Sequence, residues 1–430
     1  MGVNMKKSYI NKDFSRFSYV VKSCSLEEFK RLEKINDGVY CLPSGETTLD
    51  ILVDGLQTES HNHCLVFFSG ALARRDDSYP PYFSGIKISK ELGMPFISIS
   101  DPTIDLDEEI LLGWYAGNSN DSIIQEKVTM LLEHVAITSN FKFIIMGGSG
   151  GGFAALDLSR RLASKSITIV WNPQISIENY LLDHVIKYLE VAFPDTWLGI
   201  DSNMSGGEAK AYIKSFFEER GITNTILGAS FSAEVDVVYL QNKSDWHMKS
   251  HLRPFFNERS WSRVGVSSFF SEDGVGLYIG DWAKGHAPPP RNLVKEIIGL
   301  VVDFDMSAKN IAGHLSNVFD KKKTSLLPVD VMSFSPEVSI FDYEDFWRIS
   351  VDLSSILKDL DMCGLNYEVA VYAYKRDRKV GVFWYQKKSF FDIPKKESEE
   401  SLDEVDAVKV FVRDVMGNGV NKLVPVYRHP

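Results

Sequence analysis

The sequence contains few cysteines and no long apolar run, and each absence excludes a class of protein. Only four of the 430 residues are cysteine, namely Cys24, Cys41, Cys64 and Cys363. They are widely spaced and form no C-x-x-C pair, so they indicate neither a disulfide framework nor a zinc site. No stretch approaches the roughly 18 apolar residues that a membrane-spanning helix needs, and we therefore expect no segment that crosses a membrane.

The chain also lacks an excess of positive charge. Its net charge is −11 and its isoelectric point is near 5.4, which argues against bulk electrostatic binding to nucleic acid or to an anionic membrane. A polyanionic substrate held in a local basic cleft is still compatible with this balance. Residues 1–12 show no apolar segment of the kind found in signal peptides, and we expect a cytoplasmic location.

Hydrophobic patterning divides the chain into three parts. In residues 49–305, apolar strand runs alternate with helical segments, which is typical of an α/β-hydrolase-like, mostly parallel sheet with helices on both faces. We expect residues 1–48 to lead into that sheet as an N-terminal extension. Residues 306–430 contain alternating apolar and polar residues between turns and predict an all-β, sandwich-like accessory domain. The lysine-rich stretch Asp320–Ser325 is typical of a solvated linker.

The most informative stretch joins an apolar strand run to a run of helix formers through a series of glycines. Phe141–Met146 is followed by Gly-Gly-Ser-Gly-Gly-Gly, in which Gly147, Ser149 and Gly151 match G-x-S-x-G, the nucleophile elbow of α/β-hydrolases. A serine on so sharp a turn needs neighbours without Cβ atoms, because the backbone there is strained and tightly folded. The turn lifts the Ser149 hydroxyl above the sheet and directs the N-terminus of the next helix toward a developing oxyanion.

Glycine-rich turns between a strand and a helix also bind phosphate, which gives two alternative interpretations. A P-loop would end in Gly-Lys-Ser/Thr, whereas this stretch continues as Gly-Phe-Ala. Gly150, Gly152 and Ala155 satisfy the loose dinucleotide fingerprint, but the acidic residue expected at the end of the next strand is missing. That strand run, Ile167–Trp171, is followed by Asn-Pro-Gln. The nucleophile elbow is the favoured interpretation, with a nucleotide loop and a purely structural turn as alternatives.

Two residues downstream of Ser149 complete a candidate catalytic triad. A serine hydroxyl needs a histidine base and an acid that orients the histidine, and in α/β-hydrolases they follow in the order serine, acid, histidine. Asp245 lies just past the strand run Val235–Leu240, and His286 lies past the next run, Val275–Ile279, on a loop bounded by glycine and proline. We therefore predict the triad Ser149, Asp245 and His286. The alternative for His286 is an ordinary surface-loop histidine.

Other acids and histidines compete for these roles. Asp195 and Asp273 are weaker candidates for the acid, and Asp245 would also suit the N-cap of a helix beginning beside it. His247 and His251 rival the base because they lie close to Asp245 in sequence. On a helix these two histidines share a face at i and i+4, a spacing seen at metal sites. The glutamate of H-E-x-x-H is absent, and we predict no metal.

The remaining candidates concern the oxyanion hole and the binding of substrate, and several lie on or just past the loop that follows the strand run His63–Phe68. We expect the oxyanion hole to combine the backbone N–H of Gly150 with that of Ala71 on this loop. Candidate substrate-binding residues lie further along the chain: Arg74, Arg75, Trp114 and Tyr115. The arginines suit a phosphate or carboxylate, and the aromatic rings suit stacking on a sugar. Solvated loop arginines and simple core packing are the respective alternatives.

Four stretches together resemble the bacterial α/β-hydrolase-fold carbohydrate O-acetyltransferases. They are Gly147–Ala155, Trp171–Gln174, Gln241–His247 and Gly285–Pro288. This group includes the accessory secretory-system protein that acetylates sugars on serine-rich adhesins, and some capsule-polysaccharide acetyltransferases. The resemblance covers residues 49–302 and depends on the combination of stretches. The whole chain is also similar to capsular polysaccharide biosynthesis proteins.

The resemblance implies a role for each member of the triad. Ser149 would be the nucleophile, His286 the general base and then acid, and Asp245 the residue that orients His286. The acyl donor would be acetyl-CoA and the acceptor a hydroxyl of a polysaccharide or glycan, with other polysaccharide-assembly proteins as partners. Two further functions stay open. One is a carbohydrate esterase with the same triad, and the other is a non-catalytic scaffold in a polysaccharide-assembly complex.

Overall fold

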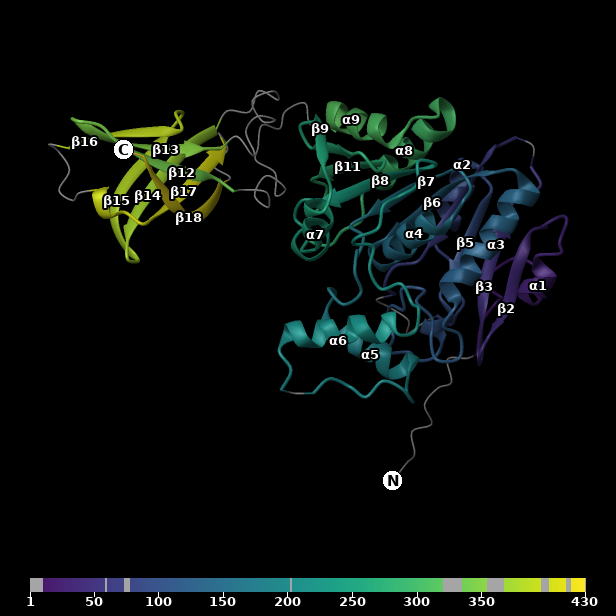
Figure 1. Cartoon of the computed structure of the whole chain (residues 1–430). Helices are drawn as coiled ribbons and strands as arrows, with labels where there is room; N and C mark the ends of the chain where they lie inside the picture. Colours follow the sequence, from purple (N-terminus) through teal and green to yellow (C-terminus); the bar gives the residue numbers. More distant parts are fainter. Residues whose placement is uncertain are drawn as a thin grey trace. The chain divides into compact units, whose positions relative to one another are not determined.

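Two β-sheets organise the part of the chain that the structure describes, one of eleven strands and one of seven (Figure 1). The structure is a computed structural model that describes residues 11–58, 60–72, 78–201, 203–319, 335–353, 367–395, 402–414 and 419–429. It divides into two compact units, Met1–Ser262 with Ser268–His314, and Arg263–Ser267 with Leu315–Pro430. The expected linker Asp320–Ser325 lies outside the described residues. Within the described ranges, no helix has the length and apolar character needed to cross a membrane.

Six parallel strands form the centre of the larger sheet, in the spatial order β5-β4-β6-β7-β8-β11. They are β4 (His63–Phe68), β5 (Phe96–Ser100), β6 (Lys142–Gly148), β7 (Ser166–Trp171), β8 (Val235–Asn242) and β11 (Val275–Gly280). Nearly every residue of these strands is buried. Because both faces of such strands are covered, they appear in the sequence as continuous apolar runs.

Further strands, joined mostly by antiparallel pairing, extend this sheet at both edges. One edge has β1 (Val21–Ser23), β2 (Gly38–Ser44) and β3 (Thr47–Asp54), so residues from the N-terminal part of the chain belong to the sheet itself. The other edge has β10 (Ser268–Ser271) and β9 (Trp261–Gly265). The expected α/β class with a mostly parallel sheet is confirmed.

Helices cover both faces of the parallel strands. The connection from β4 to β5 runs through α2 (Ile86–Leu92) in one direction along the sheet, and that from β6 to β7 runs through α4 (Ser149–Arg161) in the opposite direction. Since such crossovers are right-handed, α2 and α4 lie on opposite faces. Helix α3 (Ile124–Ser139) contacts α4, and α8 (Arg291–Phe304) is joined to α2 by ion pairs of Glu91.

The remaining helices include an insertion between β7 and β8. It contains α5 (Leu182–Ala192) and α6 (Gly206–Glu218), which are drawn in teal away from the sheet (Figure 1). Their apolar faces are buried through aromatic contacts, such as that between Tyr188 and Phe217. The sequence pattern did not predict these two helices. Three further helices are α1 (Leu26–Phe29), α7 (Arg253–Asn257) and α9 (Ala308–Phe319).

The smaller sheet has the strand order β15-β14-β17-β18-β12-β13-β16. Its strands are β12 (Glu337–Asp342), β13 (Phe346–Asp352), β14 (Tyr367–Lys375), β15 (Arg378–Gln386), β16 (Phe390–Pro394), β17 (Ala407–Asp414) and β18 (Gly419–His429). Strand β18 pairs antiparallel with β17 through its first part and parallel with β12 through its last part. Buried side chains from both halves form one hydrophobic core. The expected β-rich accessory domain is confirmed, with one parallel pair that the sequence pattern did not reveal.

A buried ion cluster ties the start of the described chain to the larger sheet. The ammonium of Lys12 lies 2.9 Å from a carboxylate oxygen of Asp105 and also pairs with Asp50. It donates a further hydrogen bond to the carbonyl of Thr48 at 2.7 Å. The Lys12 side chain is 8% exposed and both carboxylates are 0% exposed. Removing the cation would leave two buried carboxylates without their countercharge.

We predict that Lys12→Met lowers the free energy of unfolding at pH 7 by about 3–5 kcal/mol, the usual cost of removing one partner from a buried ion pair. Urea unfolding followed by circular dichroism would measure the change. Lys30→Met is the matched control, because Lys30 pairs with Glu27 at the surface, where such pairs contribute about 0–1 kcal/mol. Equal effects of the two substitutions would contradict the prediction.

Candidate active site

Ser149 occupies a strained turn between β6 and α4. Its φ is +53°, a left-handed conformation that residues with a side chain rarely adopt. The two positions before it must be glycine, because neighbouring atoms leave no room for a Cβ there. A Cβ at Gly147 would lie 2.2 Å from the carbonyl oxygen of Gly151, and one at Gly148 would lie 1.9 Å from the indole nitrogen of Trp171. The geometry is therefore that of a nucleophile elbow.

The Ser149 hydroxyl accepts a hydrogen bond from Gln174. The distance from Gln174 Nε2 to Ser149 Oγ is 3.1 Å, and the Gln174 backbone N–H donates to the Ser149 carbonyl at 3.0 Å. Among the described interactions, the hydroxyl is bonded to Gln174 rather than to His286. Hydrogen bonds between a nucleophile and its base are often long before substrate binds.

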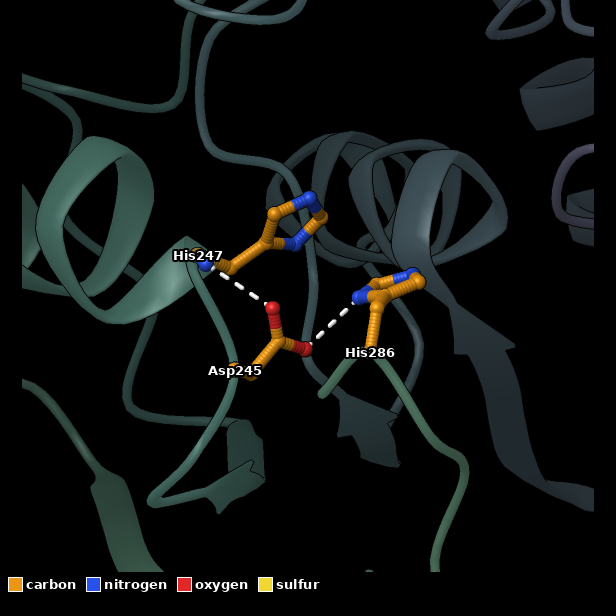
Figure 2. Close-up of side chains that lie close together, drawn as sticks. All are labelled: Asp245, His247 and His286. Carbon is orange, nitrogen blue, oxygen red and sulfur yellow. Dashed lines mark hydrogen bonds and ion pairs between the residues drawn. The ribbon is translucent and has the colours of Figure 1, made fainter. Parts of the chain in front are cut away.

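Asp245 and His286 form a hydrogen-bonded pair, as Figure 2 shows. Nδ1 of His286 lies 2.6 Å from one carboxylate oxygen of Asp245. The other oxygen accepts the backbone N–H of His247 at 2.9 Å. The Asp245 side chain is 0% exposed, whereas that of His286 is 36% exposed. A carboxylate that accepts the Nδ1 proton leaves Nε2 of the imidazole free to accept another, which is the tautomer that a general base needs.

Two asparagines hold the loop that carries His286. The side-chain amide of Asn242 donates to the carbonyls of Ala283 and Gly285, at 2.7 and 2.8 Å. The side-chain amide of Asn172 donates to the carbonyl of Ala287 at 2.7 Å. Both asparagines lie in stretches that carry the family resemblance, but no role for them is evident from the sequence. Asn172 directly follows β7, and Asn242 is the last residue of β8. The sheet therefore places both beside the loop of His286, although Gly285 on that loop lies 43 residues after Asn242 in the chain.

Ser149 and His286 line the same pocket, whose volume is about 750 Å³. It lies at the carboxyl ends of the parallel strands, because Phe68, Gly148 and Trp171 also line it. Both Gly70 and Ala71 contribute to its wall. This position agrees with the general rule that open α/β sheets bind ligands beyond the carboxyl ends of their strands.

The predicted oxyanion residues lie on either side of Ser149. Gly150 is in the first turn of α4, where backbone N–H groups have no partner within the helix, and a Cβ there would lie 2.4 Å from Leu112. On the other side, a Cβ at Gly70 would lie 3.7 Å from that of Ser149, which brings the loop containing Ala71 next to the serine. The two residues are thus placed where an oxyanion hole could be formed.

The stacking role expected for Trp114 and Tyr115 is not supported, because both rings are in the core. Trp114 is 0% exposed and Tyr115 is 2% exposed. The indole N–H of Trp114 donates to Gln174 Oε1 at 2.5 Å, and the hydroxyl of Tyr115 bridges Ser69 and Ile99. The packing alternative is therefore correct for these rings in this structure. Arg74 and Arg75 lie outside the described residues.

His247 and His251 are buried beside the candidate pair. Nδ1 of His247 lies 2.8 Å from the carbonyl oxygen of Asn172, and Nδ1 of His251 accepts the N–H of Ile175 at 3.2 Å. Burial, with a contribution from the nearby His286, lowers the pKa of His247 to about 4. Burial also lowers the pKa of His251 well below its usual value. Both rings are therefore neutral at pH 7.

The same region contains a set of side chains that could act as metal ligands. Asp245, His247 and His286 each offer one ligand atom, and these atoms lie within 4.8 Å of one another. Both carboxylate oxygens of Asp245 already accept hydrogen bonds, from the His247 backbone and the His286 ring. The contacts within this set are thus those of an acid that orients a histidine.

We predict that the buried histidines make the protein less stable as the pH falls below 7. Since the folded pKa of His247 is lowered from about 6.5, the unfolded chain binds a proton that the folded chain does not. This contribution to the free energy of unfolding is present above pH 6.5 and is lost between about pH 6.5 and 4. At pH 5 the loss relative to neutral pH is about 2 kcal/mol. Urea unfolding of wild type and His247→Asn at pH 7 and 5 would measure it.

The variant should show a smaller loss of stability between pH 7 and 5 than the wild type. Between pH 7.5 and 8.5 the ring is neutral in both states, so the difference between the two proteins should stay constant there. Equal losses in both proteins between pH 7 and 5 would contradict the prediction.

Comparison with known proteins gives structural neighbours only. No family model matches the chain, and no curated protein matches its sequence. The capsule O-acetyltransferase of Neisseria meningitidis serogroup A is similar over 58% of this chain and 91% of its own, with 17% identity and a TM-score of 0.41. The acetyl xylan esterase from Paenibacillus sp. R4 is similar over 64% of this chain and 90% of its own, with 12% identity and a TM-score of 0.37.

A third neighbour is an α/β hydrolase from Sphaerobacter thermophilus, similar over 60% of this chain and 98% of its own at 11% identity and a TM-score of 0.32. These neighbours include an acyltransferase and hydrolytic enzymes. The values are too low to assign an activity to this chain. Its α/β-hydrolase-like fold follows from its own strand order and elbow, and the function proposed below depends on the geometry of the site.

Proposed function

We propose that this chain is a serine-dependent acyltransferase that O-acetylates a bacterial surface polysaccharide or glycan. The observation that supports the proposal is the joint placement of a strained serine and an Asp245–His286 pair at one pocket. Serine at such an elbow, with a histidine oriented by a buried carboxylate, is the arrangement used for acyl transfer on several unrelated folds.

The reaction would proceed in two steps through an acyl-enzyme. Ser149 Oγ attacks the thioester carbonyl carbon of acetyl-CoA while its proton passes to Nε2 of His286. The C–S bond breaks, and His286 returns the proton to the leaving thiolate. In the second step, the acceptor hydroxyl gives its proton to His286 and attacks the acetyl carbon, and the proton passes to Ser149 Oγ as the C–Oγ bond breaks. The N–H groups of Gly150 and Ala71 would bind the oxyanion in both steps.

The lining of the pocket suits a donor with an uncharged part and a phosphate-bearing part. Phe67, Ile88 and Val294 provide apolar wall, and Lys87 and Arg291 provide cationic groups. Arginine and lysine side chains bind phosphates well, although Arg291 also pairs with Glu91 at 3.0 Å. The polysaccharide acceptor, other assembly proteins as partners and the cytoplasmic location belong to the same proposal.

We predict that a fluorophosphonate probe labels the wild-type protein at Ser149 and does not label Ser149→Ala. The probe forms a bond with an activated serine, so labelling requires a base that accepts the proton. Intact-protein mass spectrometry would detect one added probe. Ser205→Ala is the matched control, because Ser205 caps helix α6 and is exposed, and it should label like the wild type. Labelling that persists in Ser149→Ala would contradict the nucleophile assignment, and its absence from the wild type would favour a non-catalytic scaffold.

We predict that a strain producing only the Ser149→Ala protein loses O-acetyl groups from its surface polysaccharide. Mass spectrometry of the purified polysaccharide from mutant and parent strains would measure the acetyl content. A loss agrees with transfer to a sugar hydroxyl, because that reaction adds the group. A gain would contradict transfer and identify the alternative, a carbohydrate esterase, in which water accepts the acyl group.

A further inference from the structure

Gln174 donates two hydrogen bonds to Ser149, and it has no role in the proposed triad. It is 0% exposed, so it reaches the serine from the protein interior and leaves the pocket side of Oγ open. It donates from Nε2 to Ser149 Oγ at 3.1 Å and from its backbone N–H to the Ser149 carbonyl at 3.0 Å. Backbone and side chain of Gln174 therefore hold the same strained residue.

The contact with Trp114 fixes which way the Gln174 amide points. An indole N–H can only donate a hydrogen bond, and it lies 2.5 Å from Oε1 of Gln174. A rotated amide would place its NH₂ group against the indole N–H and lose this bond. Trp114 is itself held by edge-to-face contacts with Tyr180 and Tyr188, at ring separations of 6.0 and 5.4 Å. The amide is thus presented to Ser149 as a donor.

This orientation determines what the serine hydroxyl can do. Oγ accepts a hydrogen bond from Gln174, so its own proton is not used in that bond and can be donated on the pocket side, where His286 lies. When the proton leaves, negative charge develops on Oγ. A fixed N–H donor aimed at an atom that gains negative charge stabilises the transition state, because no reorganisation is needed at that moment.

We propose that Gln174 is a catalytic residue of this site and that Trp114 is its positioning residue. The Nε2–H of Gln174 stabilises the charge on Oγ when the serine proton passes to His286 and the bond to the acyl carbon forms. It does so again when the C–Oγ bond of the acyl-enzyme breaks and the proton returns to Oγ. This inference rests on the proposed function of Ser149 as a nucleophile.

The test compares rates of fluorophosphonate labelling of the full-length protein and its variants. Gln174→Met removes the donor with little change in volume, and it should slow labelling at pH 8 by about a hundred- to a thousandfold, as expected for loss of one preorganised donor. Trp114→Phe should slow labelling less, and it should have no further effect in the Gln174→Met background. Gln125→Met is the matched control, because Gln125 is a buried, hydrogen-bonded glutamine on α3 that does not contact Ser149. It should label at the wild-type rate.

A second variant, Gln174→Glu, separates donation from packing. An ionised carboxylate cannot donate to Oγ, whereas a protonated one can. The rate of Gln174→Glu relative to the wild type should therefore be lowest at pH 8 and should rise as the pH is lowered to 6. A loss of packing alone would leave that ratio independent of pH. Thermal unfolding of each variant shows that it is folded at the labelling temperature, and if Gln174→Met does not fold, Gln174→Glu and Trp114→Phe decide.

The outcomes distinguish this inference from the function on which it rests. If Gln174→Met is labelled at the wild-type rate, the role of Gln174 is overturned and Ser149 is still the nucleophile. If Gln174→Met is unfolded, labelling of Gln174→Glu at the wild-type rate has the same meaning. A pH-independent ratio for Gln174→Glu would also overturn it. If the wild type is not labelled at Ser149, the proposed function fails and this inference fails with it.

Discussion

The left-handed backbone of Ser149 is the constraint on which the rest of the site depends. Its φ of +53° is stable only because the surrounding structure compensates for the strain. On one side, a side chain at Gly147 or Gly148 would overlap Gly151 or Trp171. On the other, the backbone of the serine is bonded to the residue three positions beyond the end of β7. The serine is thus fixed both by the end of β6, which leads into it, and by β7 and the segment that follows β7.

The rest of the site is built at the ends of neighbouring strands. β6 supplies the serine, the segment after β8 supplies Asp245, and the loop after β11 supplies His286. Asn172, after the intervening strand β7, accepts the backbone N–H of Asn242 at 2.7 Å and donates to the loop of His286. Buried amide groups of this kind are costly unless every partner is present. The order of the strands in the sheet therefore determines which reacting groups meet at the site and which polar contacts hold them there.

The sequence predicted the parts of the molecule that repeat a strong local pattern. Buried parallel strands appear as apolar runs, and G-x-S-x-G fixes Ser149, so searching past later strands was enough to select Asp245 and His286. Gln174 was missed because its importance comes from contacts with Trp114 and Ser149, and those contacts depend on how strands and loops meet in space. For the same reason the sequence left open whether Trp114 stacks on a sugar or packs in the core, since an aromatic residue in a loop has no sequence signal for whether its ring is buried or exposed.

The shared strand β18 has a consequence for how the accessory domain is made. Its first part completes the pairing with β17 and its last part completes the pairing with β12, although β12 precedes β17 by more than sixty residues in the chain. During synthesis the two halves would each present an open edge until β18 has left the ribosome, and open edges favour pairing with other chains. The candidate serine, aspartate and histidine are all translated before any strand of this domain. The strands of the larger sheet are therefore all available for pairing before the first strand of the β domain is translated, and premature termination before β18 would leave β12 and β17 with open edges.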